Sequence, residues 1–280
     1  MRRKYRRTVT LLRKLHRENP QDPFATYFLA NSYCAYKRYQ HAIVWGEKSL
    51  VLLRAMDKAP VHYLSVYSTL ITSAMQLRRY AEVKRYCNEV LQLYPRYLDA
   101  HYYLTCLAFM SKQFADAVKH GDDYFATRAY MLADPANCST IMHYTLNLVC
   151  WIEYYYGFSV LMQDRAEDGV EYLARCIRTK NVKAGLIVEM VHNLLAVSRH
   201  DLARKIVEDV LQAHAGKVEV LVLLARELLD DGLLFWLEKP ASRWSEEKIT
   251  DEASPFLTGC AHVLCGRDEQ AREILAKVSV

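Results

Sequence analysis

The chain has 280 residues, of which 52% are apolar and 25% charged, and its formal net charge is +5. This small charge does not favour nucleic acid as a partner, and the scarcity of glycine and proline favours helices over strands. No window approaches about 20 uninterrupted apolar residues, and no apolar secretion signal opens the chain, so we expect no membrane span. Eight cysteines without a CxxC pair suit a reducing compartment, and we predict a cytoplasmic protein.

Residues 1–22 are predicted to form an amphipathic helix that ends before Pro20. Val9, Leu12 and Leu15 share one face, and arginine and lysine cover the other. In the register of the residues that follow, this is the second helix of a repeat whose first helix is absent. The chain is therefore either part of a longer protein or capped by a lone helix. We interpret the basic face as a solvated helix surface. Binding of nucleic acid to this face is the second interpretation.

Residues 23–131 repeat their side-chain sizes every 34 residues. The blocks begin at Pro23, Leu64 and Leu98, with a seven-residue insertion at 57–63, and Pro95 stands at position 32 of the second block. Small residues near positions 8 and 20 allow two helices of one unit to approach closely. In the three blocks, position 7 is Leu29, Leu70 and Leu104, position 11 is Tyr33, Ala74 and Ala108, position 17 is Tyr39, Tyr80 and Phe114, and position 20 is Ala42, Val83 and Ala117.

A 34-residue helix-turn-helix period with these small residues and a proline at position 32 is the signature of the tetratricopeptide repeat, and the chain resembles that family. The resemblance implies an all-α fold, a right-handed helical solenoid in which each unit contacts only its neighbours. We expect about six helix-turn-helix units in addition to the N-terminal half-unit.

The same register divides the remaining chain into an insertion at 132–149, repeats four and five at 150–217, and a degenerate repeat with a C-terminal capping repeat at 218–280. We expect one long helix from Thr140 to Met162, with Ser139 or Thr140 as its N-cap. In the last part, residues 218–229 are predicted to form a first helix that ends near Gly232, followed by a short second helix. A final helix is expected at 268–278.

The sequence contains no set of residues that would support catalysis. We find no GxSxG, no phosphate-binding glycine loop, no HExxH and no CxxC. Cys260, His262 and Cys265 are close in sequence but point in different directions on a helix. Asp122 and Asp123 are interpreted as charges at a helix end. We therefore predict no catalytic residue, no cofactor, no metal site and no enzymatic activity.

The resemblance also indicates a binding surface. In the family, positions 2, 5, 9, 12 and 13 of each first helix line the concave face, which in this chain is polar in the second block and aromatic in the third and fourth. The predicted binding residues are Tyr27, Asn31, Ser68, Thr72, Gln76, Tyr102, Cys106, Phe109, Trp151, Tyr154 and Phe158.

Two interpretations of this aromatic wall remain open. Exposed aromatic and methionine clusters are typical of surfaces that hold a peptide or a helix, so we predict a scaffold that binds a protein or peptide on its concave face. Alternatively, the predicted helix 140–162 or the insertion before it folds across the wall and buries it.

A narrower resemblance suggests a second function. Leu11–Lys14, Glu18–Phe24 and Tyr94–Asp99 resemble the repeat tails that follow bacterial family 2 glycosyltransferase domains. This resemblance implies an accessory region, in a glycosyltransferase or a cell-surface glycan system, that positions an acceptor or partner and transfers no sugar itself.

Overall fold

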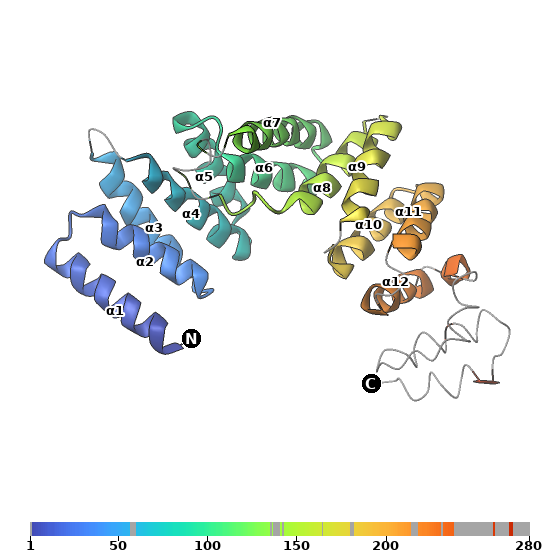
Figure 1. Cartoon of the computed structure of the whole chain (residues 1–280), viewed down its shortest axis with the longest axis horizontal. Coiled ribbons are helices and arrows are strands. Elements are labelled where there is room, and N and C mark those ends of the chain that lie inside the picture. The colour runs from blue at the N-terminus through green and yellow to red at the C-terminus, as the bar shows by residue number, and fades with distance from the viewer. Residues whose placement is uncertain are drawn as a thin grey trace. The chain divides into compact units, whose positions relative to one another are not determined.

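The computed structural model describes residues 2–56, 60–134, 136, 141, 143–163, 165–179, 182–213, 218–230, 232–237, 260 and 269–270. Twelve α-helices lie in these residues, and no strand occurs among them (Figure 1). The all-α fold predicted from the sequence is therefore confirmed. The chain divides into two compact units, 1–166 and 167–280, which we call the N-terminal and C-terminal units.

The N-terminal unit is a series of helical hairpins joined by short turns. A 3-10 helix at Val61–Leu64 stands directly before its fourth α-helix. Asp22 caps the second helix, because its side chain accepts a hydrogen bond from the amide of Phe24 and Pro23 occupies the first turn. The α-helices are α1 (Arg2–Glu18), α2 (Pro23–Ala35), α3 (Tyr39–Arg54), α4 (Ser65–Gln76), α5 (Tyr80–Leu93), α6 (Leu98–Met110), α7 (Phe114–Ala133) and α8 (Val149–Leu161).

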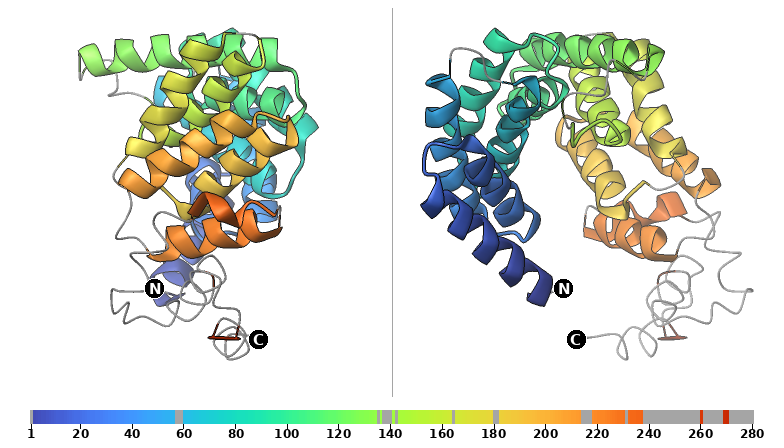
Figure 2. Two further views of the ribbon diagram at one scale, coloured as in Figure 1. Left: turned by 90° about the vertical axis from the view of Figure 1, so that its right-hand side faces the viewer. Right: turned by 60° about the vertical axis from the view of Figure 1, so that its left-hand side comes forward.

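Each helix of this unit packs against the next one in the chain, and the helices lie side by side (Figure 2). The first helices of the hairpins also contact one another, α2 with α4, α4 with α6, and α6 with α8. These four helices form one layer, and α3, α5 and α7 form the other. We call the layer of α2, α4, α6 and α8 the inner face. When the first helices of successive repeats pack more closely than the second helices, the array curves with its first helices on the inside.

Four turns between paired helices have the same backbone geometry. Lys37, Arg78, Lys112 and Ser198 are left-handed, with φ of 59°, 57°, 57° and 60°. In each turn the next amide bonds to the carbonyl five residues earlier, at 2.8 Å for Gln113 N to the oxygen of Ala108. All four residues occupy position 15 of their blocks. The 34-residue register is therefore confirmed in three consecutive blocks and in the block that begins at Ala184.

The turn at Lys112 gives a test of this geometry. A residue with a Cβ pays roughly 1–2 kcal/mol in the left-handed region, which glycine does not. We expect Lys112→Gly to raise the free energy of unfolding by up to about 1 kcal/mol and Lys112→Val to lower it, measured by urea denaturation. Lys119→Gly, at an exposed site inside α7, is the control and should cost about 1 kcal/mol. Similar losses for both glycine variants would contradict the assignment.

At two glycines, the second helix of a repeat packs closely against the first helix of the next repeat. A Cβ on Gly46 of α3 would lie 2.6 Å from Cδ2 of Leu70 on α4. A Cβ on Gly121 of α7 would lie 2.2 Å from Cδ2 of Tyr156 on α8. Both glycines are at position 24 of their blocks, and both partners are at position 7. The close approach of successive repeats therefore depends on a small residue at position 24.

The predicted long helix from Thr140 to Met162 is wrong in its first part. The helix α8 begins at Val149, and residues 143–148 are not helical. The amides of Tyr144 and Thr145 donate to the carboxylate of Asp99 in α6, at 3.0 and 2.9 Å, so they do not enter a helical ladder. The predicted N-caps, Ser139 and Thr140, lie outside the described residues.

The interpretation of Asp122 and Asp123 as helix-end charges is also wrong. The helix α7 continues to Ala133, so both residues lie near its middle. The hydroxyl of Tyr156 donates to Oδ1 of Asp122 at 2.6 Å, which links α7 to α8. Asp122 therefore serves a contact between neighbouring repeats.

The C-terminal unit contains α9 (Ala166–Arg178), α10 (Ala184–Ala196), α11 (His200–Ala213) and α12 (Val218–Asp230). The predicted first helix at 218–229 is confirmed by α12, and Gly232 follows it with φ of 70°. A 3-10 helix at Leu234–Leu237 stands where a short second helix was predicted. The expected final helix at 268–278 lies almost entirely outside the described residues. No helix in the described residues is long and apolar enough to cross a membrane.

Candidate functional site

A non-helical segment of the chain lies on the inner face of the N-terminal unit. Residues 143–148, which we call the strap, connect to the start of α8 and contact α6 through Asp99. The Asp99 carboxylate is fully buried and accepts hydrogen bonds from the amides of Tyr144 and Thr145. It also accepts one from the Thr145 hydroxyl at 2.7 Å. Because a carboxylate accepts several hydrogen bonds, this one side chain satisfies three donors of the strap.

The polar residues of α4 complete the surroundings of Asp99. Ser68 is fully buried, and its hydroxyl donates to Oδ2 of Asp99 at 2.5 Å. The hydroxyl of Tyr97 accepts from the amide of Ser68 at 3.1 Å and donates to the carbonyl of Leu64 at 2.9 Å. Burial, together with the charge of Asp99, raises the pKa of Tyr97 well above its usual value. Tyr97 therefore remains a neutral hydroxyl in this network.

The carbonyl groups of the strap are bound from α7. The hydroxyl of Tyr124 donates to the carbonyl of Thr145 at 2.8 Å, and Nε of Arg128 donates to that of Leu146 at 3.2 Å. The ring of His143 meets the ring of Tyr97 edge to face, with centroids 5.3 Å apart. Burial lowers the pKa of His143. Two amides and two carbonyls of the strap are thus bound by side chains of the repeats.

The residues predicted to bind a ligand differ widely in exposure. The sequence placed all of them on one face, and the structure buries about half of them. Asn31, Thr72, Phe109 and Trp151 are partly buried, and Gln76 is exposed. The buried residues are Tyr27, Ser68, Tyr102, Cys106, Tyr154 and Phe158.

The aromatic residues of the third and fourth blocks pack against one another. The ring of Phe109 on α6 lies 5.4 Å from that of Tyr154, 4.9 Å from that of Tyr155 and 5.5 Å from that of Phe158, all on α8. The strap belongs to the predicted insertion and contacts the inner face at Asp99, and Phe109 packs against α8. That the predicted residues contact a ligand stays a prediction.

Sequence reasoning predicted an insertion at 132–149 but missed the strap within it. Tyr144 of the strap is 40% exposed, and Phe24 and Phe28 of α2 are 42% and 39% exposed. The rings of Phe24 and Phe28 are 4.6 Å apart. Nothing in the helical periodicity indicates the strap, because its partner Asp99 lies more than 40 residues earlier in the chain.

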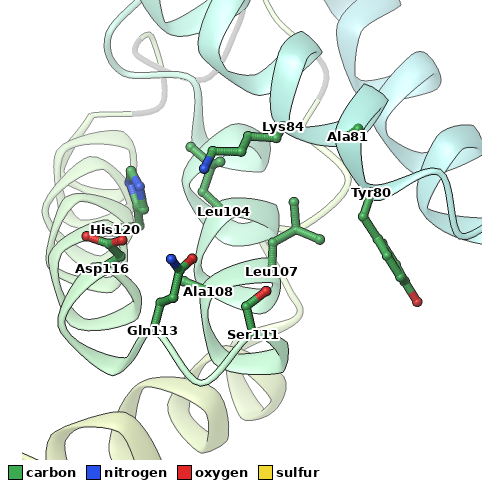
Figure 3. Close-up of a pocket in the computed structure, with 10 residues that line it drawn as sticks. All are labelled: Tyr80, Ala81, Lys84, Leu104, Leu107, Ala108, Ser111, Gln113, Asp116 and His120. Atoms are coloured by element: carbon green, nitrogen blue, oxygen red, sulfur yellow. The ribbon is translucent and has the colours of Figure 1, made fainter.

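A second hollow lies between α5, α6 and α7. Leu104, Leu107 and Ala108 of α6 line a pocket of about 220 Å³, and Figure 3 shows Lys84 of α5 reaching toward His120 on α7. A neighbouring pocket of about 420 Å³ is lined by residues of α5, α6 and α7, among them His101 and Asp123. Burial, followed by the neighbouring His101, lowers the pKa of His120. The two histidines therefore belong to adjoining pockets.

A known structure shares this architecture. The C-terminal part of a TPR repeat-containing protein from Cytophaga hutchinsonii matches 97% of this chain and 95% of its own, with a TM-score of 0.57 and 11% identity. The structure of Pseudomonas aeruginosa pilF matches 83% of this chain and 94% of its own, with a TM-score of 0.46 and 12% identity. No protein-family model and no curated protein matches the sequence. The first likeness shows the fold alone, which is that of tetratricopeptide-repeat proteins.

Proposed function

We propose that the chain is a non-catalytic scaffold that binds a polypeptide segment on the inner face of its N-terminal unit. The observation that carries this proposal is that the inner face already holds a non-helical main chain, the strap. Asp99 binds its amides and Tyr124 binds one of its carbonyls. Every polypeptide offers such backbone groups, and the part of the inner face that the strap leaves open presents further polar side chains, Thr72 and Gln76.

The partner binds beside the strap, at the C-terminal ends of α4, α6 and α8. Gln76 and Met110 occupy position 13 in adjacent repeats, and Met162 occupies it in the next. Gln76 is exposed and Met110 is 50% exposed, while Thr72 and Phe109 are partly exposed next to them. Together they offer a polar group beside an apolar surface. This combination fits a peptide with one apolar anchor and hydrogen-bonding neighbours.

The buried residues of the predicted set support this surface without contacting the partner. Tyr102, Cys106, Tyr154 and Phe158 fill the space between α6 and α8 and hold Phe109 in place. Their role in the proposal is to fix the shape of the wall. Tyr27 and Ser68 belong to the part of the face nearer the strap.

A peptide-display library selected against the purified chain supplies ligands for a test, with affinities measured by fluorescence anisotropy. We expect Met110→Glu to weaken the selected peptides at least tenfold, because it places a charge where an apolar anchor would be desolvated. Leu132→Glu on α7, with Leu132 56% exposed, is the matched control and should bind like the unmodified chain. A library that yields no ligand, or equal binding by both variants, would contradict the proposal.

A further inference from the structure

Two histidines and an aspartate meet between the helices of the third repeat. His101 lies on α6, and His120 and Asp123 lie one turn apart on α7. One possible ligand atom from each residue is within 4.8 Å of those from the other two. Nδ1 of His101 is 3.8 Å from Oδ2 of Asp123. These are the side chains that divalent transition metals bind in proteins.

The hydrogen bonds of His101 indicate which nitrogen is available to a ligand. Its Nε2 lies 2.8 Å from the carbonyl oxygen of Pro95, and because a carbonyl only accepts, Nε2 carries a proton. In the neutral ring, Nδ1 then carries a lone pair. The Nδ1 atom is buried and has no hydrogen-bond partner among the described residues. His101 as a whole is only 6% exposed. A ring nitrogen bonded to a backbone carbonyl is the arrangement that orients histidines bound to metals.

The lone pair of His101 faces another acceptor, the carboxylate of Asp123. At 3.8 Å these two acceptors do not contact each other, and a cation between them would satisfy both. Nδ1 of His120 is likewise buried without a hydrogen-bond partner in the described part of the chain. A metal ion would satisfy all three side chains at once, whereas one proton satisfies a single pair.

We propose that His101, His120 and Asp123 bind a divalent transition metal ion, with Zn²⁺ as the first candidate. Imidazole and carboxylate ligands suit Zn²⁺, whereas Mg²⁺ and Ca²⁺ prefer sites made of oxygen atoms. Tetrahedral Zn²⁺ holds its donor atoms roughly 3.3 Å apart, because each is about 2.0 Å from the metal. The Asp123 side chain is 51% exposed, so its rotation can shorten its distances to the two histidine nitrogens.

The geometry also indicates what the ion would do. It would join α6 to α7 and leave a fourth coordination position open to solvent in the adjoining pockets, which are lined by His120 on one side and Asp123 on the other. Asp99, two residues before His101 on α6, holds the strap. Metal binding would therefore stabilise the repeat that carries the strap, in proportion to the occupancy of the site.

Titration of the metal-free chain with Zn²⁺ against a chromophoric chelator tests the proposal. We expect one ion per chain, and affinity at least tenfold lower in His120→Gln and in Asp123→Asn. His120 is partly exposed and Asp123 is exposed, and circular dichroism verifies folding. His192→Gln and Asp201→Asn are controls that should keep full affinity, because His192 pairs with Glu227 and Asp201 is an exposed residue of α11.

Spectra of the Co²⁺ form separate this site from the cysteines of the chain. Co²⁺ bound by nitrogen and oxygen ligands gives d–d bands without the charge-transfer band that a thiolate produces. We expect d–d bands alone. Absence of stoichiometric Zn²⁺ binding, unchanged affinity in His120→Gln and Asp123→Asn, or a thiolate band would overturn the proposal. None of these results depends on whether a peptide binds the inner face.

Discussion

Replacing Asp99 by alanine is expected to lower the free energy of unfolding of the N-terminal unit by about 3–5 kcal/mol. The carboxylate is fully buried and accepts hydrogen bonds from Ser68, from the amides of Tyr144 and Thr145 and from the Thr145 hydroxyl. Removing it leaves the amide and the hydroxyl of Thr145 without this acceptor in a buried site. Asp99→Asn keeps the volume but loses one charged acceptor, so a smaller loss is expected.

Hydrogen exchange distinguishes loss of the strap from general unfolding. In Asp99→Ala, the amides of Tyr144 and Thr145 should exchange far faster, while those in the middle of α3, remote from the strap, should change less. Asp116→Ala removes an exposed carboxylate and is the control, with an expected cost below about 1 kcal/mol. Retained protection of Tyr144 and Thr145 in Asp99→Ala would show that the carboxylate does not hold the strap.

Gly121→Ala is expected to destabilise the N-terminal unit by about 2–3 kcal/mol, although alanine is the better helix former. The added Cβ would lie 2.2 Å from Cδ2 of Tyr156. The ring has little room to withdraw, because it is only 4% exposed and its hydroxyl is bonded to Asp122. The predicted cost therefore comes from displacing α8 relative to α7.

Gly185→Ala is the matched control for this prediction. Gly185 also lies in a helix, α10, but an added Cβ would meet no described atom within 4 Å. The change should stabilise by up to about 1 kcal/mol through helix propensity. Equilibrium unfolding in urea, followed by circular dichroism, measures both variants. Shifts of the same sign would mean that the contact between Gly121 and Tyr156 does not limit the packing.

The helical hairpins were predictable from the sequence because their contacts repeat with the period. Leu29, Leu70 and Leu104 recur at position 7, and all three are buried. The small residues at position 24 follow the same period, although the sequence analysis did not single them out. They are Gly46, Cys87 and Gly121.

Features that depend on distant residues were not predictable from local patterns. The segment before Val149 lacks any strong helix breaker, yet it is non-helical because Asp99 competes for its amides. The cluster of His101, His120 and Asp123 combines residues from two helices, and only its His-x-x-Asp spacing on α7 was visible in the sequence. The cytoplasmic location and the glycosyltransferase-associated function remain predictions.

The strap also determines how a competing ligand would have to behave. It is covalently joined to α7 and α8, so its effective concentration at Asp99 is on the order of millimolar. A free peptide at micromolar concentration that used the same backbone contacts would be outcompeted by roughly a thousandfold. Only a ligand with much stronger contacts elsewhere, or one tethered to the same assembly, would replace the strap at Asp99.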